Sequence, residues 1–228
     1  MVSTVSNKKN AHVIGALVLI PFFAYGIGSG LFTSIINSQN PLSSIAANQL
    51  QLSLGAILML INSICVIGIG VMFYPILKVK SKKTALIYLC TRIIEALLLV
   101  VGLISLLSII AISNSYVKAG ETHPLFFEAL IQIANKANYW AYQIAMTLLG
   151  IGSIGFCYVL LQHKLIPKFL ALLGIIGYCL LSFGGFLEIL GYPISIYLSI
   201  PGGLFEIGLV LRLFIKGFTL TGIKDTLS

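Results

Sequence analysis

Apolar residues along this chain form six long runs, and short polar segments separate them. Each run has about 20 residues or more, which is the length that an α-helix needs to cross a hydrocarbon core roughly 30 Å thick. The pattern therefore predicts six membrane-spanning helices. Their expected ranges are residues 11–36, 50–77, 84–111, 139–161, 168–190 and 194–215.

The composition excludes a water-soluble domain. Apolar residues make up 58% of the 228 residues and charged residues only 9%. A soluble domain of this length could not cover its surface with so few charges. We therefore expect an all-α, polytopic integral membrane protein whose residues 1–228 form a single transmembrane domain. The first apolar run exceeds the roughly 7–15 residues of a signal-peptide core, so we expect it to be a span.

Lysine and arginine alternate between loops in the way that sets membrane orientation, because these residues favour cytoplasmic loops. The first and fifth loops contain none, and the third contains only Lys118 and Lys136. Most of the others lie at the two ends of the chain and around the second and fourth loops: Lys8, Lys9, Lys78, Lys80, Lys82, Lys83, Lys164, Lys168, Arg212, Lys216 and Lys224. We expect a multi-pass protein of the cell (inner, cytoplasmic) membrane with both termini in the cytoplasm.

The net charge of +8 does not indicate nucleic-acid binding. The lysines are divided among four short segments, and no base-stacking aromatic residues are interleaved with them. Membrane orientation and attraction to anionic lipid explain them better. The lipid bilayer is thus the expected partner, and no nucleic acid is expected.

Two loops have helical features. In the first, Asn40-Pro41 is typical of a helix start with proline at the first position. In the third, residues 124–135 place apolar residues at helical spacing, with Glu128 and Gln132 on another side. This pattern predicts an amphipathic helix on the outer surface, which is either a passive element or a lid over an outward-facing cavity.

The residues of common hydrolytic and metal sites are missing from the sequence. The three histidines, His12, His123 and His163, lie near the predicted interfaces, and the only aspartate is Asp225. No nucleophile elbow, P-loop or HExxH motif is present. The four cysteines lie inside spans without CxxC spacing, which is typical of packing residues. We expect no catalytic residue, no metal and no cofactor.

Three ionisable residues lie deep inside predicted spans, namely Arg92 and Glu95 in the third and Glu206 in the sixth. Each costs roughly 2.5–3.5 kcal/mol near the centre of a membrane helix, so such residues usually pair, bind or relay. From the rise per residue, Arg92 lies roughly 12 Å from the cytoplasmic end of its span, Glu95 about 16 Å and Glu206 about 15 Å. All three share one layer, whereas Glu188 and Arg212 fall near the interfaces and are expected to be ordinary interfacial charges.

The common depth predicts that the third and sixth spans are neighbours. Arg92 and Glu95 are three residues apart on one helical face, and Arg92 could also reach Glu206. One cation and two anions leave an excess of −1 when all are ionised. We expect one glutamate to hold a proton, or a cation or cationic ligand to supply the missing charge. The alternative is a purely architectural pair with a neutral second glutamate.

Pro201, Gly202 and Gly203 stand about one turn before Glu206. A broken helix beside a buried carboxylate is how many transporters expose backbone groups to an ion or substrate, so a helix break is one prediction for these residues. The alternative is an ordinary helix that begins at Pro201. Glycines in the other spans are expected to mark close contacts between helices.

Several segments resemble a known family. They are the tail from Ile200-Pro201 through Glu206-Ile-Gly208 to Lys216-Gly217-Phe218, the segment Leu165-Ile-Pro167 with Gly174 and Gly177-Tyr178, and the arginine of the third span, Arg92. Over residues 8–218 the chain resembles an uncharacterised family of small bacterial membrane proteins, domain-of-unknown-function family four-three-eight-six. Arg212 departs from the pattern, since a tryptophan is common there. The resemblance implies a six-helix integral membrane protein and no established activity.

Three classes of function remain open. A small-molecule or ion binding or transport protein would use the layer of Arg92, Glu95 and Glu206 as its polar site. Six spans can form two inverted repeats of three spans each, and the last span of each repeat, the third and the sixth, would then carry buried charge. A structural or regulatory membrane subunit would have no ligand of its own. An intramembrane enzyme is the third class, and the missing ligand clusters disfavour it.

Overall fold

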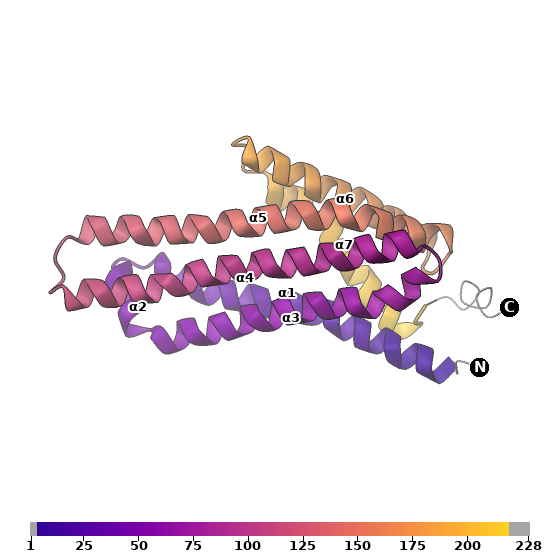
Figure 1. Ribbon diagram of the computed structural model, residues 1–228, viewed down its shortest axis with the longest axis horizontal. Helices are drawn as coiled ribbons and strands as arrows, with labels where there is room; N and C mark the ends of the chain where they lie inside the picture. The colour runs from indigo at the N-terminus through magenta and orange to yellow at the C-terminus, as the bar shows by residue number, and fades with distance from the viewer. Residues whose placement is uncertain (1–3, 219–228) are drawn as a thin grey trace. The chain divides into compact units, whose positions relative to one another are not determined.

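Residues 4–218 are described in the computed structural model, with side chains from Asn10 onward, and they contain helices but no strand (Figure 1). Six of the helices are long and apolar enough to cross a membrane, which confirms the all-α fold with six predicted spans. The helices are α1 (Thr4–Ile36), α2 (Pro41–Ala47), α3 (Gln49–Lys78), α4 (Lys82–Lys118), α5 (Pro124–Gln162), α6 (Lys168–Ile189) and α7 (Ser195–Ile215).

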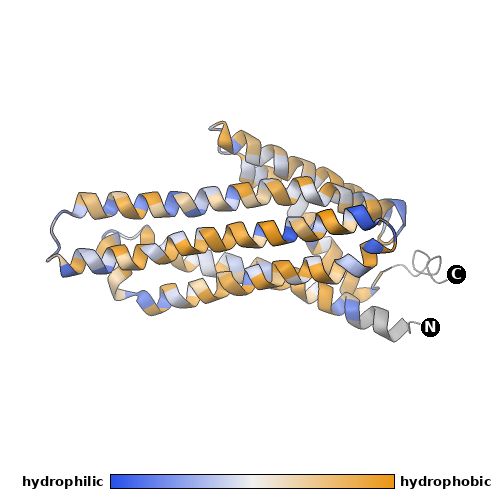
Figure 2. Ribbon diagram, viewed as in Figure 1, coloured by the Kyte–Doolittle hydropathy of each residue, from blue (hydrophilic) through white to orange (hydrophobic). Residues whose placement is uncertain are grey.

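The surface of the long helices is apolar. Figure 2 shows hydrophobic residues along most of their length and hydrophilic residues at the turn between α3 and α4. Large apolar side chains such as Ile64, Leu97 and Phe183 are more than half exposed. Such a surface is stable against lipid and unfavourable in water, so the exposed side chains support a membrane environment.

The contacts of the chain gather into two compact units, each built from pieces of several helices. Within the described residues, the first unit contains residues 4–20, 65–96 and 143–218, and the second contains residues 21–64 and 97–142. Each unit has its own cluster of buried apolar side chains.

The second unit is held by close backbone approach and by buried polar contacts. A Cβ at Gly28 would lie 2.7 Å from the backbone oxygen of Gly55, so α1 and α3 meet without side chains between them. Ser113 of α4 donates its hydroxyl to the backbone oxygen of Leu42 in α2. The helix α2 begins at Pro41, as Asn40-Pro41 predicts.

One predicted boundary differs from the structure. The sequence predicts a long third loop with a separate helix at 124–135, whereas α4 continues to Lys118 and residues 124–135 form the start of the continuous helix α5. Span prediction from hydropathy stops where polar residues begin, but a helix can continue through polar residues that have adequate helix propensity. Here α4 ends at the turn with Gly120 at φ 70°. The ring of Tyr116 packs against Phe127 with centroids 5.5 Å apart.

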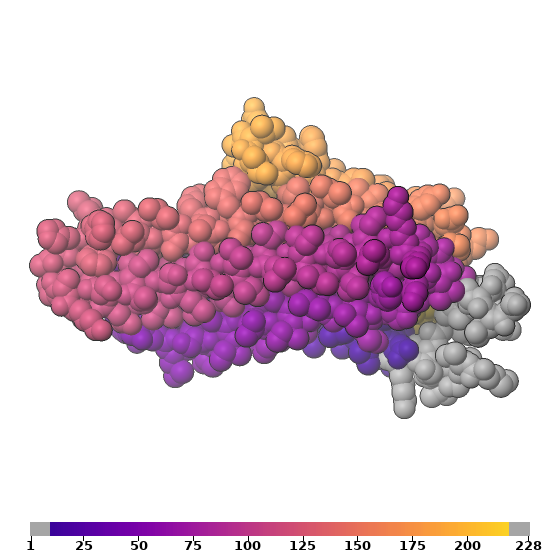
Figure 3. All heavy atoms as spheres, in the orientation of Figure 1, coloured from indigo at the N-terminus to yellow at the C-terminus, as the bar shows by residue number. Residues whose placement is uncertain are grey.

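In the first unit, α6 and α7 form a close helix pair. The helices α6 and α7 lie side by side, and their connecting turn is exposed (Figures 1 and 3). A Cβ at Gly177 of α6 would lie 2.5 Å from the backbone nitrogen of Gly202 in α7, so the two backbones touch. The expectation that glycines mark helix contacts is confirmed at this position.

The predicted helix break at Pro201, Gly202 and Gly203 is not seen. The helix α7 is continuous from Ser195 to Ile215 with Pro201 inside it, and it does not begin at Pro201 either. Proline removes one helical hydrogen bond, but membrane helices tolerate this where neighbouring groups and small local adjustments satisfy the freed carbonyl. Gly202 serves the contact with α6 instead.

Membrane orientation remains a prediction, which cysteine labelling in a cysteine-free background tests. Single cysteines at Ser43, Ser115 and Tyr192 should react with a membrane-impermeant reagent from outside the cell. Cysteines at Ser81 and Lys224, the latter outside the described residues, should react only after the membrane is opened. Labelling of Ser115 from the cytoplasmic side would contradict the orientation that the lysine pattern predicts.

Candidate functional site

Two of the three predicted site residues come from α4. The hydroxyl oxygen of Ser81 accepts the backbone N–H of Thr84 at 3.3 Å and so caps the first turn of this helix. Further along α4, Arg92 and Glu95 lie in the interior of the first unit, with their side chains 5% and 4% exposed.

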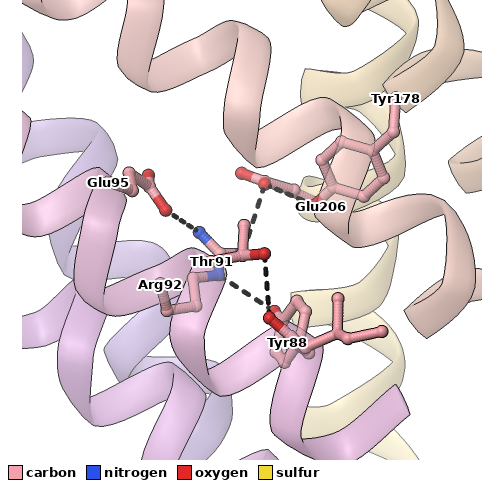
Figure 4. A network of polar contacts seen from close by, with 7 residues as sticks. Tyr88, Thr91, Arg92, Glu95, Tyr178 and Glu206 are labelled. Atoms are coloured by element: carbon pink, nitrogen blue, oxygen red, sulfur yellow. Dashed lines mark hydrogen bonds and ion pairs between the residues drawn. The ribbon is translucent and has the colours of Figure 1, made fainter. Parts of the chain in front are cut away.

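The guanidinium of Arg92 is at the centre of a polar network (Figure 4). Its Nη1 donates to Oε2 of Glu95 at 3.0 Å. Its Nε donates to the hydroxyl of Tyr88, one turn back on α4, also at 3.0 Å. Its Nη2 lies 3.9 Å from Oε1 of Glu206 on α7. One arginine therefore serves two carboxylates from two different helices.

The third residue, Glu206, is held by α6 as well. The hydroxyl of Tyr178 donates to Oε1 of Glu206 at 2.7 Å. The side chain of Glu206 is 21% exposed, so it is the more accessible of the two carboxylates. Tyr178 is fully buried and its ring lies edge-on to Phe205, so its hydroxyl is held in place.

Aromatic packing fixes Tyr88 below the arginine. Its ring stacks on Phe156 of α5 with centroids 4.3 Å apart and meets Phe73 of α3 edge-on at 5.9 Å. The Cζ atom of Arg92 lies 5.2 Å from the centroid of the Tyr88 ring, which adds a cation–π contact.

Glycines on both neighbours of α4 bring it close to the other helices. A Cβ at Gly70 of α3 would lie 2.9 Å from Cβ of Arg92, and a Cβ at Gly152 of α5 would overlap the side chain of Thr91. Arg92 therefore has little freedom to leave the network, because its own stem is packed against the backbone of α3.

The network confirms the predicted neighbourhood of the third and sixth spans, which are α4 and α7. Arg92 reaches Glu206, and Glu95 shares the same interior. Sequence reasoning missed both tyrosines. Tyr88 could have been found, because it is four residues before Arg92 and so lies on the same helical face. Tyr178 lies in a segment that carries the family resemblance, but no spacing in the sequence links it to Arg92, because it comes from another helix.

Glu188 differs from its prediction as an ordinary interfacial charge. Its side chain is buried, and its Oε2 accepts the backbone N–H of Ser195 at 3.2 Å, at the first residue of α7. Gln143 of α5 donates to the hydroxyl of the same serine at 2.8 Å. A carboxylate at a helix N-terminus is favoured by the helix dipole, so Glu188 joins α6 to α7.

Within residues 4–218 no group of three or more histidine, cysteine, aspartate or glutamate side chains is placed to hold a metal ion. His12 of α1 has its Nε2 3.0 Å from the backbone oxygen of Phe214 near the end of α7. This contact gives His12 a packing role, away from the network around Arg92.

Comparison with known proteins assigns a family and adds no activity. No curated protein and no solved structure matches the chain. One family model, described as Domain of unknown function (DUF4386), matches residues 13–217, which include every residue of the network. The resemblance found in the sequence is thereby confirmed, and the chain belongs to the DUF4386 family of integral membrane proteins.

Proposed function

We propose that this membrane protein binds a proton or a small cation at the network of Arg92, Glu95 and Glu206, and that it is an ion- or small-molecule-binding or transport protein. One observation carries the proposal: a single guanidinium lies between two carboxylates in the interior of a membrane protein. With all three ionised, one positive and two negative charges sum to −1.

An unbalanced charge is unfavourable at this depth. Burying an ion away from water costs several kcal/mol after relaxation, and a hydrogen bond alone, such as that from Tyr178 to Glu206, offsets less of that cost than a partner of opposite charge. Arg92 already forms its shorter contact, 3.0 Å, with Glu95, against 3.9 Å for Glu206. The excess negative charge therefore belongs to Glu206, and a proton or a cation bound there neutralises the layer.

The accessibility of the carboxylates points to the same residue. The side chain of Glu95 is 4% exposed and that of Glu206 is 21% exposed. A ligand that enters the network thus meets Glu206 first, because Glu95 and Arg92 are almost fully buried. The sign of the excess charge favours a cationic ligand over an anionic one.

Substitution of Glu206 by glutamine tests the proposal. The purified wild-type protein should show a carboxyl change in infrared difference spectra between high and low pH, or on addition of a cation. Glu206→Gln should remove that change and weaken binding about tenfold or more, which corresponds to about 1.4 kcal/mol. It should leave the helix content unchanged, because the amide has the same shape as the carboxyl group.

The matched control is Glu121→Gln, which changes an exposed carboxylate in the turn between α4 and α5. This variant should bind as the wild type does. The proposal fails if the wild type and Glu206→Gln give identical spectra and take up neither protons nor cations. That result would support the purely architectural alternative.

A further inference from the structure

One buried hydroxyl close to the network has no partner. The side chain of Ser153 on α5 is 0% exposed, and its Oγ makes no hydrogen bond within the described part of the chain. A buried polar group without a partner is rare and costs roughly 1–3 kcal/mol. Such a group indicates that a ligand or an ordered molecule provides the missing contact.

Other serines in the same setting behave differently. Buried Ser63 on α3 donates to the backbone oxygen of Met59, four residues back, at 3.3 Å. Buried Ser182 on α6 donates to the backbone oxygen of Tyr178 at 3.0 Å. This bond to the preceding turn is the usual solution for serine inside a membrane helix. Ser153 does not use it, so its hydroxyl is directed elsewhere.

The position of Ser153 on α5 shows what it faces. Residues three and four further along a helix lie on the same face, and here they are Phe156 and Cys157. Phe156 stacks on Tyr88, the hydrogen-bond partner of Arg92. A Cβ at Gly174 of α6 would lie 2.7 Å from Sγ of Cys157 and 2.8 Å from the ring of Phe205, the residue before Glu206, so Cys157 is also close to the network. Ser153 therefore lies on the face of α5 that covers the network.

The surrounding packing limits the size of any ligand. A Cβ at Gly150 would lie 2.7 Å from the backbone oxygen of Tyr178, and one at Gly174 would lie 2.7 Å from Sγ of Cys157. The helices next to Ser153 are thus already in contact. Packing this close leaves no room for a bulky organic cation, so only a ligand of one or a few atoms could enter.

One carboxylate oxygen of Glu206 is available to bind a ligand. Both of its contacts use Oε1, and in the part of the chain that the structure describes Oε2 has no hydrogen-bond or ion-pair partner. A carboxylate oxygen and a hydroxyl oxygen are ligands that hard cations prefer. A monovalent cation also neutralises the excess charge of −1, whereas a divalent one would leave the layer positive.

We propose that Ser153 is a ligand of the cation that Glu206 binds, and that this cation is a small alkali ion of sodium size coordinated by oxygen atoms. This inference rests on the proposed function and narrows it. Ser153 Oγ supplies a neutral oxygen and Glu206 supplies the charge. A proton alone needs only one base, so it would give the hydroxyl of Ser153 no role.

The test is equilibrium binding of radioactive sodium to the purified protein at a pH above neutrality, with choline as the inert cation. The wild type should bind one sodium ion per chain. Ser153→Ala should lower its sodium affinity about tenfold or more. Ser153→Cys keeps the shape but replaces oxygen with sulfur, a poor ligand for a hard cation, and should show the same loss.

The matched control is Ser63→Ala, which removes a buried hydroxyl that already has its partner in the preceding turn. It should keep the affinity of the wild type. Equal sodium affinity in Ser153→Ala, Ser153→Cys and the wild type would overturn the inference. So would a wild type that takes up protons through Glu206 but binds no sodium, although the proposed function would then stand. A wild type that binds neither would overturn both.

Discussion

Replacement of Arg92 by alanine is expected to lower the free energy of unfolding by about 3–5 kcal/mol. The change removes the only positive charge of the network and leaves Glu95, which is 4% exposed, without its 3.0 Å partner. It also removes the donor to the hydroxyl of Tyr88. Reversible unfolding in mixed detergent micelles, followed by circular dichroism, measures the effect.

Two further variants separate the charge from the packing of the side chain. The triple variant R92M/E95Q/E206Q removes all three charges and should recover most of the lost stability, because neutral groups of similar size avoid the desolvation of ions. The control Lys83→Ala changes an exposed charge at the start of α4 and should stay within about 0.5 kcal/mol of the wild type. An Arg92→Ala protein as stable as the wild type would show that the three charges are not coupled.

The spans could be predicted because the bilayer fixes their length and excludes charge. Predicted and observed helices end close together at most boundaries, as for the last span, expected at 194–215 and found as Ser195–Ile215. The prediction was poorest at residues 112–138, where α4 and α5 extend beyond the apolar runs. Hydropathy identifies the part of a helix that lies inside lipid, and it does not detect helical turns that continue outside the membrane.

The charged part of the site could also be predicted, because depth along a helix follows from the rise per residue. The shared layer of Arg92, Glu95 and Glu206 required no knowledge of helix packing. Tyr178 and Ser153 could not be found in this way. Tyrosine and serine are tolerated at many depths, and only the arrangement of α5, α6 and α7 shows which of them face the network.

The prediction for Glu188 failed for a similar reason. Its depth correctly places it near one end of α6, but depth does not show burial. A carboxylate at that level can face water, or it can cap a neighbouring helix as Glu188 does for Ser195. The choice depends on the short connection between α6 and α7, which turns the start of α7 back toward Glu188.

The second large effect is expected for Gly177→Ala in α6. The added Cβ would lie 2.5 Å from the backbone nitrogen of Gly202 and 2.7 Å from its Cα. Both are backbone atoms and cannot rotate away, so α6 and α7 must move apart. Overpacking of this kind costs about 1–3 kcal/mol, which outweighs the gain of about 1 kcal/mol that alanine has over glycine in a helix. The unfolding assay used for Arg92→Ala measures the loss.

Separation of these helices also reaches the site, because Tyr178 is the next residue on α6 and its hydroxyl holds Glu206 of α7 at 2.7 Å. Gly177→Ala should therefore lower stability and also weaken the ligand binding that we propose at Glu206. Gly203→Ala is the matched control: it lies on α7 next to Gly202, but a Cβ there has no described atom of another helix within 4 Å. It should be as stable as the wild type or slightly more so, since alanine favours the helix. Equal losses in the two variants would mean that glycine at position 177 is not required for contact between α6 and α7.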